Sequence, residues 1–103
     1  MTKSLHTYQP MTESAFCILF CLQQQMHGYD IGKKVLELTN DRLNIGPGTM
    51  YGTLSKMQKD NLIELVKEED KRKIYQITQL GKGILETEIN RIKQLYQITQ
   101  GGL

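Results

Sequence analysis

The sequence lacks a long apolar stretch. Its longest uninterrupted apolar run, residues 15–22, has eight residues in a chain of 103, whereas a helix that crosses a bilayer needs about 20. The N-terminus does not combine a basic segment with an apolar one, as a secretory signal does. We therefore expect a cytosolic protein of one domain that does not interact with membranes.

Cysteine is scarce as well. Cys17 and Cys21, the only two, lie four residues apart in that apolar run. In the cytosol they would remain reduced, and no third and fourth ligand follow at the spacing of a metal site. We interpret them as small buried apolar residues in preference to a redox pair. No metal and no cofactor is predicted.

A recognisable catalytic set is also missing. The residues suggest no Ser-His-Asp or Cys-His-Asn arrangement. The segment Gly46-Pro47-Gly48 is not followed by the Lys and Ser or Thr of a phosphate-binding loop. We expect His27 to be a structural hydrogen-bonding residue and Tyr29 to pack with its hydroxyl bonded. The sequence therefore does not predict an enzyme.

No strong excess of one charge is present, since the formal net charge is only +2. Such a small net charge does not by itself indicate a nucleic-acid-binding protein, so any such prediction depends on where the charges lie. Residues 46–61 form a predicted turn and helix with two different faces. Met50, Leu54 and Met57 recur at helical spacing on the apolar face. The opposite face offers small, hydroxyl and cationic groups, which suit a polyanion.

Other patterns complete a mostly α fold with a small β-hairpin. We expect helices from Thr12, as N-cap, to about Gln25, over 29–39, over about 47–61 with Thr49 as a candidate cap, and over 79–99 with Thr78 as N-cap. Residues 42–45 could add a short extended segment. Two β-rich runs, 62–67 and 74–78, flank a charged tip at 68–73 and predict the hairpin. This order is that of a winged helix-turn-helix, in which the third helix enters the major groove.

Several motifs also carry a family resemblance over roughly residues 9–86. They are Met11-Thr-Glu-Ser-Ala-Phe16, His27-Gly-Tyr-Asp-Ile31, Pro47-Gly-Thr-Met-Tyr51, Asn61-Leu-Ile-Glu64 and Tyr75-Gln-Ile-Thr78. In this order they resemble the PadR family of bacterial transcriptional regulators, in its small subclass with one C-terminal helix. Residues 1–10 are polar and end at Pro10, which predicts a loose N-terminal arm. The resemblance implies a winged helix-turn-helix DNA-binding domain (11–78) and a C-terminal dimerisation helix (79–103).

The predicted DNA contacts lie on the third helix and on the wing. They are Thr49, Tyr51, Ser55, Lys56, Lys59, Lys71, Arg72 and Lys73. Lys56 and Lys59 could reach phosphates or guanine edges. Tyr51 either contacts a phosphate or sugar of the DNA or packs half-buried on the wing. The acidic residues 68–70 beside the wing cations are a departure from the family pattern, as is Gly52 where the family often has proline.

The last helix has two adjoining apolar stripes. One of them follows the 4-3-4 spacing of a coiled-coil seam and predicts a homodimer contact: Leu85, Ile89, Ile92 and Tyr96. The alternative is a helix that lies deep in its own domain. A homodimer would bind a pseudo-palindromic double-stranded DNA operator. The family resemblance implies that it acts as a repressor and that a small hydrophobic or phenolic effector could release it.

The absence of tryptophan argues against an aromatic drug cage of the kind found in some small PadR proteins. A winged-helix module that binds a protein partner, without sequence-specific DNA binding, is the other functional hypothesis.

Overall fold

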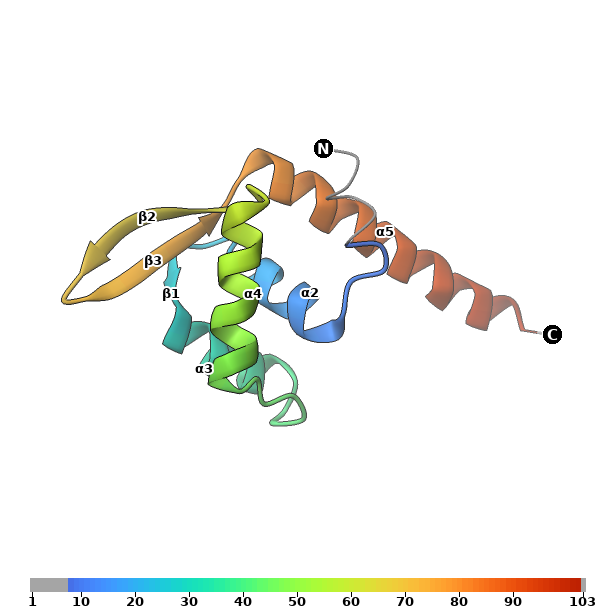
Figure 1. Ribbon diagram of the computed structural model, residues 1–103. Helices are drawn as coiled ribbons and strands as arrows, with labels where there is room; N and C mark the ends of the chain where they lie inside the picture. The colour runs from blue at the N-terminus through green and yellow to red at the C-terminus, as the bar shows by residue number, and fades with distance from the viewer. Residues whose placement is uncertain (1–7, 103) are drawn as a thin grey trace.

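The computed structural model describes residues 8–102. Its elements follow one another as α2 (Glu13–Cys21), β1 (Met26–His27), α3 (Gly28–Leu38), α4 (Pro47–Lys59), β2 (Ile63–Glu69), β3 (Arg72–Ile77) and α5 (Gln79–Gly101). The β2–β3 hairpin and α5 project from opposite sides of the helical body (Figure 1). This arrangement is a winged helix-turn-helix followed by a long C-terminal helix, as the sequence predicts.

Helix α2 begins as expected but ends earlier. Thr12 is its N-cap, and the Thr12 side chain accepts a hydrogen bond from the Ala15 amide at 3.1 Å. The predicted end near Gln25 is wrong, because the chain tightens after Cys21 into i to i−3 bonds, with the Gln24 amide 3.3 Å from the Cys21 carbonyl. This turn frees residues 26 and 27 to pair with a strand.

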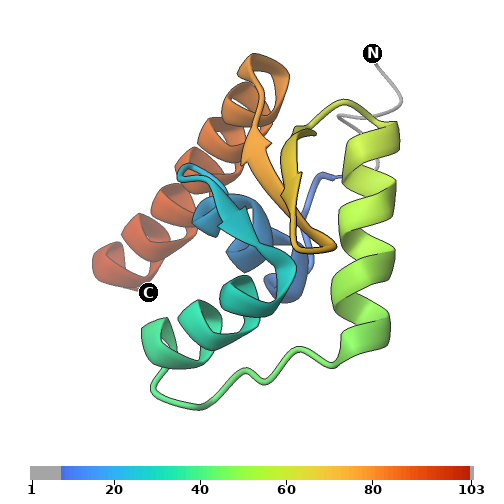
Figure 2. The same ribbon diagram turned by 90° about the vertical axis from the view of Figure 1, so that its left-hand side faces the viewer.

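The sheet has three antiparallel strands in the order β1-β3-β2. Residues 26–28, predicted only as a helix break, in fact contain strand β1, where Met26 pairs with Tyr75. The sequence signal for such a two-residue strand is too short to detect. Strand β3 therefore lies between the wing's outer strand and the start of the helix-turn-helix (Figure 2).

The hairpin turn is tighter than predicted. The strands extend to Glu69 and from Arg72, so the turn consists of Asp70 and Lys71, not of residues 68–73. Both turn residues have positive φ, 51° and 66°, which a two-residue hairpin turn of type I′ requires. The hydrophobic runs did not reveal this, because the last strand residues are all charged.

Helix α4 is anchored by the apolar face that the sequence predicts. Met50, Leu54 and Met57 are all buried. The helix begins at Pro47 with Gly46 as N-cap, so Thr49 is not the cap. The linking segment 42–45 before it forms no strand.

Helix α5 divides into a buried and an exposed half. Its N-cap is Thr78, whose side chain accepts from the Gly81 amide at 3.0 Å. Ile84 and Leu85 belong to the core that α2, α3 and α4 share. Beyond residue 91 every described residue of this helix is exposed, and this part extends away from the body (Figure 1). No helix in residues 8–102 is both long and apolar enough to cross a membrane.

A short segment before α2 joins the ends of two helices. Tyr8 is buried, and its hydroxyl donates to an Asp60 carboxylate oxygen at 3.0 Å. Three residues later the Met11 amide donates to Glu88 at 2.9 Å. Residues 1–7, the rest of the predicted arm, lie outside the described part of the chain. Residues 8–11 therefore link the end of α4 to the middle of α5.

Candidate nucleic-acid interface

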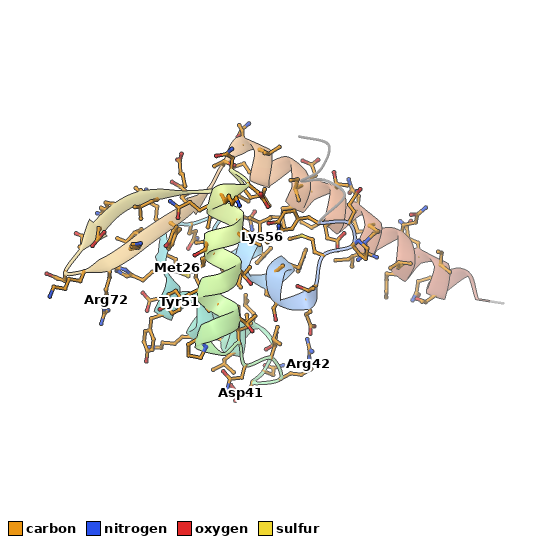
Figure 3. The ribbon with its side chains drawn as sticks, viewed as in Figure 1. Met26, Asp41, Arg42, Tyr51, Lys56 and Arg72 are labelled. Atoms are coloured by element: carbon orange, nitrogen blue, oxygen red, sulfur yellow. The ribbon has the colours of Figure 1, made fainter. Side chains whose placement is uncertain are left out.

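A cleft of ≈ 560 Å³ separates α4 from the wing. Five of the eight predicted DNA contacts line it: Tyr51, Ser55, Lys71, Arg72 and Lys73. Tyr51 and Arg72 are on the same side of α4, toward the hairpin (Figure 3). The fold thus brings Tyr51 and Ser55 of α4 together with the wing cations on one surface, although they are 16 or more residues apart in the sequence.

The exposed side of α4 carries two separate lines of residues. Tyr51, Ser55 and Lys59, each four residues from the next, follow the flank nearer the wing. Thr49 and Lys56 follow the other flank, where Lys56 forms an ion pair with Asp60. All five predicted contacts on this helix are exposed, but Thr49, Lys56 and Lys59 do not line the cleft.

Tyr51 is placed by a close approach between two helices. A Cβ atom at Gly28 would lie 2.9 Å from a ring carbon of Tyr51 and 3.3 Å from Leu54. The absence of a side chain at Gly28 therefore lets the Tyr51 ring rest on the first turn of α3. The ring remains 53% exposed, so it packs against the start of α3 and can still contact a ligand.

Four further residues of the cleft were not predicted as contacts. They are Gly28, which has no side chain, and His27, Tyr29 and Tyr75. Tyr75 is buried, and this burial, with the nearby Tyr51 and Glu68, raises the pKa of its phenol. In the sequence, Tyr75 occupies an inward position of a predicted strand, and this pattern indicates a core residue, not a DNA contact.

His27 and Tyr29 both differ from expectation. The Nδ1 atom of His27 is buried without a hydrogen-bond partner among the described residues, so a structural hydrogen bond through this atom is wrong. Tyr29 does not pack inward, since it is 65% exposed and Lys33 lies over its ring, 5.7 Å from the centroid. Both residues therefore add polar and aromatic groups to the lining of the cleft.

The wing carries opposite charges on paired positions. Glu68 is opposite Lys73, and Glu69 is opposite Arg72. Such cross-strand pairs stabilise a hairpin modestly. In residues 8–102, no ion pair involves Lys71, Arg72 or Lys73. Glu69 instead pairs with Lys67 of its own strand at 3.7 Å. The acidic residues therefore reduce the net charge of the wing without forming an ion pair with the three cations at 71–73.

The predicted dimer contacts divide between core and surface. Leu85 is 3% exposed in the core of its own chain, and Ile89 packs against that core. Ile92 and Tyr96 are 41% and 65% exposed, and they share the projecting half of α5 with exposed Leu95 and Ile98. Burial within the chain's own domain thus applies to the first half of the helix, and the dimer contact stays a prediction that only the exposed second half can meet.

One buried charge was missed entirely. Glu88 is 1% exposed and accepts hydrogen bonds from Arg91 at 2.8 and 2.7 Å. These bonds lower the pKa of Glu88 against the raising effect of its burial, and the Met11 amide adds to the lowering. A single glutamate in an amphipathic helix gives no sequence signal of such a role.

The geometry defines the class of protein, a winged helix-turn-helix with exposed cations on its third helix and wing. A family model described as "Transcriptional regulator PadR-like family" matches residues 18–87. The chain belongs to this PadR-like family and is a DNA-binding transcriptional regulator. This confirms the resemblance that the motifs carry.

Individual relatives agree with this assignment. The transcriptional regulator YqjI of Escherichia coli K12 is 30% identical over 69 residues, which are 67% of this chain and 33% of that protein. The crystal structure of a PadR family regulator from Clostridium difficile R20291 is 27% identical, with a TM-score of 0.73 over 84% of this chain and 94% of that one. Bacillus subtilis PadR in complex with operator DNA shares the fold at 21% identity, with a TM-score of 0.65 over 88% of this chain and 61% of that one.

Proposed function

We propose that the chain is a homodimeric repressor that reads a pseudo-palindromic operator. Each subunit would place α4 in the major groove and the wing along the adjacent phosphates. The observation that carries the proposal is the cleft, where Tyr51 and Ser55 of α4 face the three wing cations. The crystal structure of Bacillus subtilis PadR in complex with operator DNA, a protein that has the same fold, supports the proposal.

The groove contacts are tested by salt-dependent binding. A gel-shift or anisotropy titration would compare a duplex from the gene's own promoter with a random duplex. We expect Lys59→Ala to make the plot of log K against log salt shallower by about 0.9 per subunit, because one phosphate contact is lost. Lys82→Ala removes the same charge from an exposed position on α5 and serves as the matched control.

The outcome separates the two hypotheses of function. If neither Lys59→Ala nor Tyr51→Phe changes the affinity or the salt slope, the assigned face is wrong. Equal affinity of the wild-type protein for promoter and random duplexes would instead favour the protein-interaction module. The acids that lie opposite cations across the wing, and so lower its net charge, are the observation that favours this alternative.

We propose that the second subunit docks on the projecting half of α5. Ile92, Leu95, Tyr96 and Ile98 are between 41% and 65% exposed there, and an apolar surface of this kind on a helix favours association. Leu85 does not take part, since it is already buried. Sedimentation of Ile92→Ser/Tyr96→Ser should show monomers, whereas Lys93→Ala on the same helix should sediment as wild type.

An effector is the third part of the proposal. A small hydrophobic or phenolic molecule would bind near the α5 dimer surface and shift the spacing of the two α4 helices, provided that it binds the two states unequally. The structural support is exposed Phe20 beside a hollow of ≈ 220 Å³, which is lined by residues of α2, α3 and the segment between them and by none of α5. A thermal-shift screen with phenolic acids, followed by operator release, tests it. Compounds that shift the melting temperature but leave operator binding unchanged would count against release.

A further inference from the structure

Asp60, at the end of α4, holds two groups from different parts of the chain. Its Oδ2 atom accepts a hydrogen bond from the Tyr8 hydroxyl at 3.0 Å and another from the Lys56 ammonium at 3.1 Å. The ammonium also lies 5.4 Å from the centroid of the Tyr8 ring, a cation–π distance. Tyr8 is 5% exposed, so the three groups form a cluster with one side fixed in the core.

The electrostatics of this cluster favour the charged pair. Burial alone would raise the pKa of Asp60, but the hydrogen bonds from Lys56 and Tyr8 outweigh it and lower the pKa. Burial and the contact with Asp60 both raise the pKa of Tyr8. At neutral pH, Asp60 is therefore a carboxylate, and Tyr8 remains a hydrogen-bond donor to it.

Lys56 differs in this respect from the other cations of the interface. In the described residues, neither Lys59 nor any of the three wing cations takes part in an ion pair. Those side chains can turn toward phosphates without losing a partner. If Lys56 left Asp60 for a phosphate, it would leave a carboxylate unpaired beside the negative DNA backbone. A lysine that stays paired releases no net counterion when DNA binds.

The paired Lys56 can nevertheless still donate to DNA. An ammonium group has three N–H donors, and one of them is used by Asp60. The Lys56 side chain is 53% exposed on the outer flank of α4. Its remaining donors suit the O6 and N7 acceptors that guanine presents in the major groove. A fixed donor can read a base edge more selectively than a lysine that moves freely.

We propose that Asp60, buttressed by Tyr8, keeps Lys56 away from the phosphate backbone and directs it to a guanine edge, so that Asp60 and Tyr8 are positioning residues for sequence preference. This inference rests on the proposed function, since it assumes that α4 enters the major groove. It divides the α4 lysines by role: Lys59 supplies affinity for any duplex, and Lys56 supplies discrimination.

Binding to two duplexes over a range of salt concentrations tests the proposal. One duplex is selected by the wild-type protein from a randomised pool, and the other has random sequence. Lys56→Ala should reduce the preference for the selected duplex by roughly 5- to 100-fold per half-site. It should leave the salt slope on random duplex unchanged, whereas Lys59→Ala should make that slope shallower by about 0.9 per subunit.

Asp60→Asn is the sharper variant, because asparagine can still accept the Tyr8 hydrogen bond. The freed Lys56 should then make the random-duplex slope steeper by about 0.9 per subunit, or about 3.5-fold in affinity over a fourfold change in salt. The preference for the selected duplex should fall at the same time. Tyr8→Phe, which keeps the ring and removes only the hydroxyl, should shift both readouts less, in the same direction.

Glu86→Gln on the exposed side of α5 makes the same change in net charge and should move neither readout. The proposal is overturned if Lys56→Ala makes the slope shallower as Lys59→Ala does, or if Asp60→Asn leaves slope and preference unchanged. A wild-type protein that selects no sequence from the pool would overturn the proposed function itself. Melting curves for each variant establish that a loss of binding is not a loss of fold.

Discussion

Among the glycines of the chain that the structure describes, Gly81 is the one whose replacement by alanine should be most severe. A Cβ atom there would lie 2.1 Å from the Leu62 carbonyl oxygen and 2.8 Å from a side-chain carbon of Ile77. The first contact is with backbone, so it cannot be relieved by rotating a side chain. To bring it to 3.0 Å, the shortest distance that real Cβ atoms adopt, α5 must move away from the α4–β2 junction.

That movement also strains the hydrogen bonds at the junction. The Leu62 carbonyl accepts from the Thr78 amide at 2.9 Å and from the Thr78 hydroxyl at 3.0 Å. Overpacking costs about 1–3 kcal/mol, and each weakened hydrogen bond adds about 1 kcal/mol. We therefore expect a loss of about 3–5 kcal/mol, which is a large part of the roughly 5–15 kcal/mol of a typical domain.

Urea denaturation measures this loss. The protein concentration is held fixed, because any association between chains would otherwise change the apparent stability. Gly83→Ala is the matched control on the same helix. A Cβ atom at Gly83 meets nothing within 4 Å, so alanine should stabilise the helix by about 0.5–1 kcal/mol. The reasoning is refuted if Gly81→Ala unfolds at or above the wild-type urea concentration.

Three further predictions concern the wing, the buried ion pair and the helix contact. Lys71→Gly should raise the free energy of unfolding by up to about 1 kcal/mol, since Lys71 has a φ of 66° that glycine adopts without strain. The same variant should make the salt slope of DNA binding shallower. An unchanged urea midpoint would contradict the expected gain in stability. The pKa of Glu88 is lowered from 4.5, first by Arg91, so the stability from this pair is present above pH 4.5 and is lost as the pH falls through the lowered pKa. The urea midpoint should therefore fall less steeply on acidification in Glu88→Gln than in wild type, and parallel curves would disprove the assignment. Gly28→Ala should displace the Tyr51 ring, which its Cβ would meet at 2.9 Å, and should weaken DNA binding at a cost of about 1 kcal/mol in stability; full affinity for the promoter duplex would show that the position of Tyr51 is unimportant.

The elements predicted well are those with a strong periodic pattern. The face of α4 formed by Met50, Leu54 and Met57 was predicted from spacing alone, because burial of one face imposes the helical period. The caps Thr12 and Thr78 were also predicted, since the side chain at an N-cap bonds only to the first turn. Local rules suffice for such features.

The features that were missed depend on contacts between distant residues. Strand β1 exists because Met26 and His27 meet β3 some 47 residues or more later, and nothing in a two-residue segment predicts that pairing. Likewise, the Tyr8 ring that lies beside Lys56 comes from a distant part of the chain and could not be predicted, although Asp60, four residues after Lys56, was a local signal for the ion pair. In the candidate site, the sequence identified the exposed cations, but the tertiary structure decided which of them have partners.

The order of the strands also divides the wing mechanically. At its inner end, β3 is bonded on both sides, to β1 and to β2. The register then shifts between Leu65 and Lys67, where an irregularity interrupts the ladder, and such bulges bend the strand that carries them. Beyond that point the hairpin is bonded only to itself. If the wing follows DNA as proposed, its outer end can bend with the local width of the groove, while the inner end must move as one body with the start of α3.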